Sequence, residues 1–164
     1  MKIFLVRHGD ADAEIPEALG DEARALTAKA RQALIAHFNS LSDRMRGAEL
    51  ILSSPLVRAV QTAQILSLVN KHEGLRLAHR SLIPEMPVGA LDAVIRDHAG
   101  TDLILVGHQP SMGALAAHLL ALPSFPRQVS PGTVIALEKN LEVEGTSTKL
   151  LFFAAPGQPV LEEL

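Results

Sequence analysis

MKIFLVRHG, residues 1–9, opens the chain and decides its fold. Residues 1–6 are rich in β-branched and aromatic side chains, and this run is too short for a helix, so it predicts a buried strand. The strand ends where the charged pair Arg7-His8 begins. In an open α/β sheet, ligands bind at the carboxyl ends of the strands, so the sequence places polar chemistry at a suitable edge.

Short apolar runs alternate with helical segments along the rest of the chain. We expect strands at residues 49–53, 75–78 and 102–106 and a closing antiparallel pair at 134–138 and 149–153. Helices are expected at about 27–38, from 54 onward, at about 90–98 and at about 111–122. Thr27 is expected to cap the first helix and Ser54 the second, with Pro55 in its first turn. This alternation, with a core of Leu, Ile, Val and Ala, predicts an α/β fold.

Composition limits the functions open to the chain. A length of 164 residues with 48% hydrophobic residues suits one globular domain. The net charge of -3 without any run of Lys or Arg argues against nucleic-acid binding. The chain has no Cys, which excludes disulfides, thiolate metal sites and a cysteine nucleophile. The apolar opening is too short for a signal peptide or a membrane span, so we expect a soluble, cytoplasmic protein that does not enter membranes.

Three polar segments follow predicted strands and supply two arginines and two histidines. They are Arg7-His8-Gly9, residues 53–58 ending in Arg58, and Gly107-His108. Guanidinium groups bind phosphate oxygens in a bidentate manner and keep their charge, while a neutral imidazole can attack phosphorus. Arg58 lies in the first turn of a predicted helix, where free N–H groups already favour an anion. The set predicts a site for a phosphoryl group.

These segments resemble the histidine phosphatase superfamily, the phosphoglycerate-mutase-like proteins. The matching stretches are LVRHG (5–9), SSPLVRAVQTA (53–63) and GHQP (107–110), and the short chain with RHGDA (7–11), RALT (24–27) and PEMP (84–87) is most similar to the SixA-type phosphohistidine phosphatases. Ala30 departs from the pattern, because many relatives have Gly there, and residues 124–132 match nothing assignable. The resemblance implies one domain over residues 1–164, a three-layer fold with a mostly parallel central sheet and helices on both faces.

The resemblance also implies roles for individual residues. His8 accepts the phosphoryl group, Arg7 and Arg58 bind its oxygens, and His108 stabilises the charge on the transferring group. Such a cationic pocket around one imidazole suits phosphoryl transfer, which depends mostly on positioning and charge stabilisation.

Two residues are candidates for the proton donor. Glu85 corresponds by order to the acid of many family members, and Asp10, two residues after His8, is the alternative. A departing imidazole is a far better leaving group than an alkoxide, so a phosphohistidine substrate places less demand on this acid.

The expected function is removal of phosphoryl groups from protein phosphohistidine, on a phosphorelay or carrier protein. The interval between Arg58 and His108 is filled by a helix, a strand and a helix, which leaves little for a deep lid and favours a protein side chain as substrate. A small-molecule phosphomonoesterase or mutase is the alternative, and a non-catalytic phosphate-binding adaptor is a third reading. We predict no metal or other cofactor, because the ligands are sparse and the adjacent arginines repel cations. The remaining histidines, at positions 37, 72, 79, 98 and 118, are read as structural or solvated.

Overall fold

The structure is a computed structural model, and it describes residues 1–164 except 16, 143, 145 and 146. Its elements are, in chain order, β1 (Lys2–Arg7), η1 (Asp21–Ala23), α1 (Ala28–Met45), β2 (Leu50–Ser53), α2 (Val57–Val69), β3 (Leu75–Ala78), η2 (Arg80–Leu82), α3 (Val88–Asp97), β4 (Leu103–Gly107), α4 (Ser111–Leu119), β5 (Val134–Lys139) and β6 (Thr148–Ala154). None of the helices in this described part combines the length and apolar character needed to cross a membrane.

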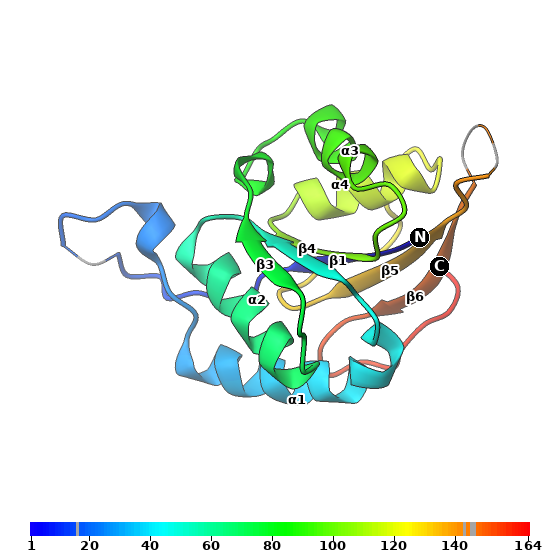
Figure 1. The fold of residues 1–164 in the computed structure, drawn as a ribbon. Coiled ribbons are helices and arrows are strands. Elements are labelled where there is room, and N and C mark those ends of the chain that lie inside the picture. The colour runs from blue at the N-terminus through cyan, green and yellow to red at the C-terminus, as the bar shows by residue number, and fades with distance from the viewer. Residues whose placement is uncertain (16, 143, 145–146) are drawn as a thin grey trace.

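The strands form one sheet in the order β3-β2-β4-β1-β5-β6 (Figure 1). Strands β3, β2, β4 and β1 run parallel, whereas β5 is antiparallel to β1 and β6 to β5. Arg7 is paired with Gly107 in the β1–β4 ladder, and Ser53 with Val106 in the β2–β4 ladder. The carboxyl ends of three neighbouring strands therefore lie at one edge of the sheet.

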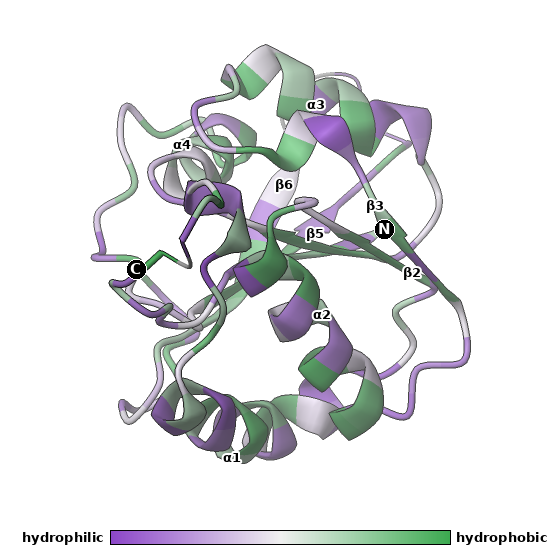
Figure 2. Cartoon of the chain, turned by 90° about the vertical axis from the view of Figure 1, so that its left-hand side faces the viewer, coloured by the Kyte–Doolittle hydropathy of each residue, from purple (hydrophilic) through white to green (hydrophobic). Residues whose placement is uncertain are grey.

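Successive residues of β1 enter different cores because side chains alternate across a strand. Ile3 and Leu5 pack in the cluster that includes α3 and α4 residues, and Phe4 and Val6 pack in the cluster that includes α1 and α2 residues. All four of these side chains are buried. Helices α1 and α2 accordingly cover one face of the sheet and α3 and α4 the other (Figure 1), and hydrophilic and hydrophobic residues alternate along α1 and α2 (Figure 2). This is the predicted three-layer α/β architecture.

The predicted elements are present, with shifts of a few residues at their ends. The strand at 75–78 and the antiparallel pair β5–β6 are confirmed. Helix α1 extends beyond the predicted end to Met45, and Thr27 caps it as expected by accepting a hydrogen bond from Ala30 N.

The predicted start of α2 is wrong. The helix begins at Val57 with Leu56 as N-cap and no side-chain cap, so Ser54 does not cap it. Ser54 N donates to Val106 O at 2.9 Å, which prolongs the sheet pairing and keeps the backbone extended past the strand. Its hydroxyl accepts a hydrogen bond from Leu56 N at 3.2 Å and lies at the active-site edge.

The long segment between β1 and α1 projects beyond the carboxyl ends of the strands (Figure 1). It contains the short helix η1 and folds back on itself through a bridge between Ala11 and Leu26. Leu26 N also donates to the Gln61 side chain of α2 at 2.8 Å. These bonds fix both ends of the segment beside α2.

Candidate active site

His8 follows β1 and is held in one tautomer. Its backbone N–H donates to Gly107 O at 3.0 Å, so the sheet pairing continues through this residue. Ring Nδ1 lies 2.7 Å from the carbonyl oxygen of Gly9, which can only accept, so Nδ1 carries the proton and Nε2 carries the lone pair. Burial, opposed by the hydrogen bond to Gly9 and aided by the charges of Arg58 and Arg7, lowers the pKa of His8 to about 4. The ring is therefore neutral at pH 7.

His108 lies beside His8 at the end of the neighbouring strand. The two ring centroids are 4.9 Å apart, with the planes inclined at 61°. The His108 side chain is buried, and its Nε2 hydrogen-bonds the Ser54 hydroxyl at 2.8 Å. Burial, followed by the proximity of His8 and Arg58, lowers the pKa of His108 to about 3. The site thus contains two neutral imidazoles among permanent cations.

Arg7 is fixed by a segment that the sequence left unassigned. Its Nη1 donates to Val129 O at 2.9 Å, and burial lowers its pKa although the charge of Asp10 opposes this shift. Gly132 N donates to the carbonyl oxygens of both Arg7 and His8, at 3.0 and 3.2 Å. Gly132 has a φ of +82°, a conformation that glycine adopts readily. Residues 129–132 therefore hold Arg7 and His8 in place.

The Arg58 guanidinium is held by Asp21 of η1. The arginine side chain is 5% exposed, and it donates from Nη1 to Asp21 O and from Nη2 to Asp21 Oδ2, both at 3.0 Å. The other carboxylate oxygen of Asp21 accepts from Arg24 Nε at 2.7 Å. Hydrogen bonds from Arg24 and then Arg58 lower the pKa of Asp21. Asp21 therefore links two cations and orients the phosphate-binding candidate.

Asp21 and Arg24 were not among the predicted site residues. The spacing of three residues between Asp21 and Arg24 is compatible with a local ion pair. The stretch RALT (24–27) indicates only the family resemblance. Nothing in the sequence connected position 21 with position 58, because that contact depends on where the β1–α1 segment folds back.

Thr62 ties the end of β1 to α2. Its hydroxyl accepts from Gly9 N at 3.1 Å and donates to Arg58 O at 2.8 Å, and the side chain is fully buried. A Cβ on Gly9 would lie 2.6 Å from Leu34 Cδ1, so only glycine fits this close approach without movement of Leu34. The Gly9 turn is therefore locked between the two helices of this face.

Neither candidate acid is bound to the four residues that the structure brings together. Glu85 is exposed and has a φ of +67° in the turn between η2 and α3. Asp10 is also exposed, and its backbone oxygen accepts from Thr27 N at 3.1 Å. Within the described residues, neither carboxylate makes a hydrogen bond or ion pair, so both are free to meet a ligand.

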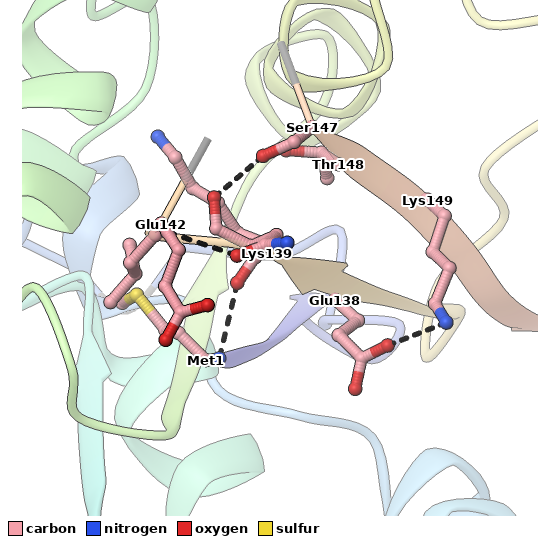
Figure 3. Close-up of a pocket in the computed structure, with 9 residues that line it drawn as sticks. Met1, Glu138, Lys139, Glu142, Ser147, Thr148 and Lys149 are labelled. Carbon is pink, nitrogen blue, oxygen red and sulfur yellow. Dashed lines mark hydrogen bonds and ion pairs between the residues drawn. The ribbon is translucent and has the colours of Figure 1, made fainter. Parts of the chain in front are cut away.

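A separate hollow lies at the opposite end of the sheet. It has a volume of about 720 Å³ and is lined by Met1, Glu138, Lys149 and their neighbours (Figure 3). Met1 precedes β1, whereas His8 follows it, so this hollow is distant from the histidine pair. Among the described residues, no cluster of three or more His, Asp or Glu side chains is arranged to hold a metal ion.

A family model described as the histidine phosphatase superfamily (branch 1) matches residues 3–92. This range is more than half of the chain and contains Arg7, His8 and Arg58. The chain belongs to the histidine phosphatase superfamily. A relative of known sequence, an uncharacterized protein of Picosynechococcus, is 37% identical over 122 residues, which is 71% of each chain. Membership of this superfamily makes the protein a phosphatase by class.

Solved structures show the same fold. The protein histidine phosphatase SixA complexed with tungstate is 22% identical, with a TM-score of 0.79 over 99% of this chain and 97% of that one. A putative phosphohistidine phosphatase SixA from Agrobacterium tumefaciens is 21% identical, with a TM-score of 0.79 over 94% of this chain and 97% of that one. A mycobacterial glucosyl-3-phosphoglycerate phosphatase is 18% identical, with a TM-score of 0.68 over 91% and 96%. The predicted fold class is confirmed.

The cationic edge predicts binding of tungstate, a phosphate-like oxyanion. Arg58→Lys should weaken tungstate binding by about tenfold to a hundredfold, because a point ammonium does not replace a guanidinium fork and hydrogen bonds to charged groups contribute about 1.5–3 kcal/mol. Isothermal titration calorimetry measures the change. The matched control is Arg46→Lys, an exposed arginine paired with Asp43. Equal affinities in the two variants would exclude Arg58 from the anion site.

Proposed function

We propose that this protein is a phosphohistidine phosphatase that hydrolyses protein phosphohistidine through a phosphorylated His8. The observation that carries the proposal is the state of His8. Its ring is neutral, its tautomer is fixed by Gly9 O, and it lies beside His108 and two arginines. An imidazole with a free lone pair at Nε2 in a cationic setting is suited to attack phosphorus.

The first step transfers the phosphoryl group to the enzyme. The Nε2 lone pair of His8 forms a bond to phosphorus while the bond from phosphorus to the substrate imidazole breaks. The departing imidazole nitrogen takes the electron pair of that bond and accepts a proton from the carboxylic acid of Glu85, with Asp10 as the alternative donor. As the Nδ1 proton of His8 stays hydrogen-bonded to Gly9 O, the positive charge that develops on the ring is stabilised by a carbonyl dipole.

The second step returns the enzyme to its starting state. Water attacks the phosphorus of phosphorylated His8 and gives a proton to the carboxylate that donated one in the first step. The bond from phosphorus to Nε2 breaks, inorganic phosphate is released, and Nε2 recovers its lone pair. Arg7 and Arg58 hold the phosphoryl oxygens in both steps, and neutral His108 donates a hydrogen bond to them. Fixed donors of this kind lower the barrier because they need no reorganisation as charge develops.

Three observations support a protein substrate. The names of two similar structures are those of SixA phosphohistidine phosphatases. The chain between Arg58 and His108 forms α2, β3, η2, α3 and β4, with no inserted lid domain in this described interval. A net charge of -3 fits a cytoplasmic phosphorelay or carrier protein as partner better than a nucleic acid.

A small-molecule phosphomonoesterase remains the second candidate. The likeness to a mycobacterial glucosyl-3-phosphoglycerate phosphatase favours it, since that protein with the same fold is named for a small phosphorylated metabolite. Free phosphohistidine, a phosphohistidine protein, an aryl phosphate and common sugar phosphates, assayed side by side, distinguish the two functions.

Substitution of the nucleophile tests the proposal directly. His8→Ala should abolish turnover and leave the circular dichroism spectrum unchanged, because His8 lies at a strand end and contributes little to the core. In the wild-type protein, mass spectrometry of the acid-labile phosphoenzyme should place the phosphoryl group on His8. His72→Ala, a histidine bonded to Leu75 O far from the site, is the control with normal activity. A phosphoryl group on His108 would contradict the assignment.

The lowered pKa of His8, about 4, predicts an acid limit for activity. Protonation removes the attacking lone pair, so phosphoenzyme formation should stay constant from about pH 8 to pH 5 and fall as the pH decreases through about 4. Rapid-quench measurements with an aryl phosphate, corrected for ionisation of the substrate, report this limb. A decrease in the rate of phosphoenzyme formation centred near pH 6.5, the ordinary pKa of histidine, would show that the ring is not desolvated as described.

Leaving-group chemistry tests the role of Glu85. Glu85→Gln removes the proton but keeps the size of the side chain, so hydrolysis of an alkyl phosphate should fall by about a hundredfold, the usual contribution of a general acid. Phosphohistidine cleavage should fall far less, because imidazole leaves more easily. Asp10→Asn is the parallel variant for the alternative donor. Equal losses on both substrates in Glu85→Gln would assign Glu85 an orienting role instead.

A further inference from the structure

A second groove begins next to the histidine pair. It has a volume of about 550 Å³ and lies between the start of α3, helix α4 and the segment after α4. Gln109 and Pro110, which directly follow His108, line it, and so does Val88, three residues after Glu85. The Gln109 side chain accepts from Gly113 N at 2.7 Å, which keeps it folded over the first turn of α4. The groove therefore begins at the residue that directly follows His108 in the chain.

The floor of the groove is apolar and is made of small side chains. Helix α4 contributes the small residues Gly113, Ala114 and Ala117. Leu122 and Phe125 form a wall, and Phe125 is anchored by its contact with Phe153, with ring centroids 5.9 Å apart. Small floor residues between larger walls let another chain approach the helix closely. A partner with a protruding apolar side chain fits this shape.

Among the described residues that line the groove, Arg127 is the one with a permanently charged side chain. His118 and Arg127 line it, both are exposed, and none of its lining residues is acidic. His118 has Asp92 at 3.8 Å, a carboxylate already shared with Arg96, whereas Arg127 makes no ion pair among the residues that the structure describes. Because the whole chain is negatively charged, this local excess of positive charge selects for acidic partners.

We propose that this groove docks an acidic segment with a large apolar residue that flanks the phosphohistidine of a partner protein. The proposal rests on the proposed function and specifies its substrate. The phosphoryl group itself is bound by Arg7 and Arg58, so a free phosphohistidine reaches His8 without entering the groove. Only a histidine within a polypeptide gains affinity from the α3–α4 surface.

The test compares three probes: free phosphohistidine and two phosphohistidine peptides with the same flanking Leu, one rich in Glu and one rich in Lys. The wild-type protein should cleave the Glu peptide with a kcat/KM at least about tenfold above that of the Lys peptide. Arg127→Glu should reverse this preference, and Ala114→Glu, on the exposed side of α4, should lower cleavage of the Glu peptide. Both variants should cleave free phosphohistidine normally. Arg76→Glu, exposed on the edge strand β3, is the matched charge-reversal control.

Several outcomes overturn the docking proposal while leaving the proposed function intact. One is that the wild-type protein cleaves free phosphohistidine and cleaves the Glu and Lys peptides with equal kcat/KM. Another is an equal loss on all three probes in the groove variants, which would place their effect at the catalytic residues. A dimer that dissociates in Ala114→Glu with unchanged peptide cleavage would assign the groove to a second copy. Absence of wild-type activity on every probe would overturn the proposed function and the docking proposal together.

Discussion

The parallel pairing of β1 with β4 is the constraint on which the site depends. Register Arg7↔Gly107 makes the two strands end together, so the residues that follow, His8 and His108, meet with ring centroids 4.9 Å apart. Both strands are buried on both faces, so a slip of the ladder by one residue would exchange side chains between two close-packed layers that are filled by different residues. The core thus sets the geometry of the chemistry.

Burial and charge act together on the histidines. Desolvation is the main cause of their low pKa values, and the arginines add to it, so neither ring becomes a cation beside Arg58 and Arg7. A pocket with four positive charges would repel itself, whereas two permanent cations and two neutral rings can bind an anion and still offer a lone pair. Asp21 reduces the remaining repulsion by holding Arg58 and Arg24 on one carboxylate.

Separate segments of the chain hold Arg7 with His8 and Gly9 with Arg58. Residues 129–132 bind Arg7 and the backbone of His8, while Thr62 and η1 hold Gly9 and Arg58. Within the described groove, residues 122–127 form a wall immediately before the segment that clamps Arg7. A partner seated there would therefore lie next to the segment that holds Arg7 and the backbone of His8.

The sequence by itself determined the order of elements and the four central residues. Apolar runs of strand length, turn residues and the Arg-His and Gly-His pairs are local signals, and parallel strands bring their carboxyl ends together in any such sheet. Tertiary structure alone decided that Asp21 orients Arg58, that residues 129–132 clamp Arg7, and that Ser54 binds His108 instead of capping α2. Each of these contacts joins residues far apart in the chain, and a polar side chain has several partners of equal chemistry until packing fixes which one lies within reach.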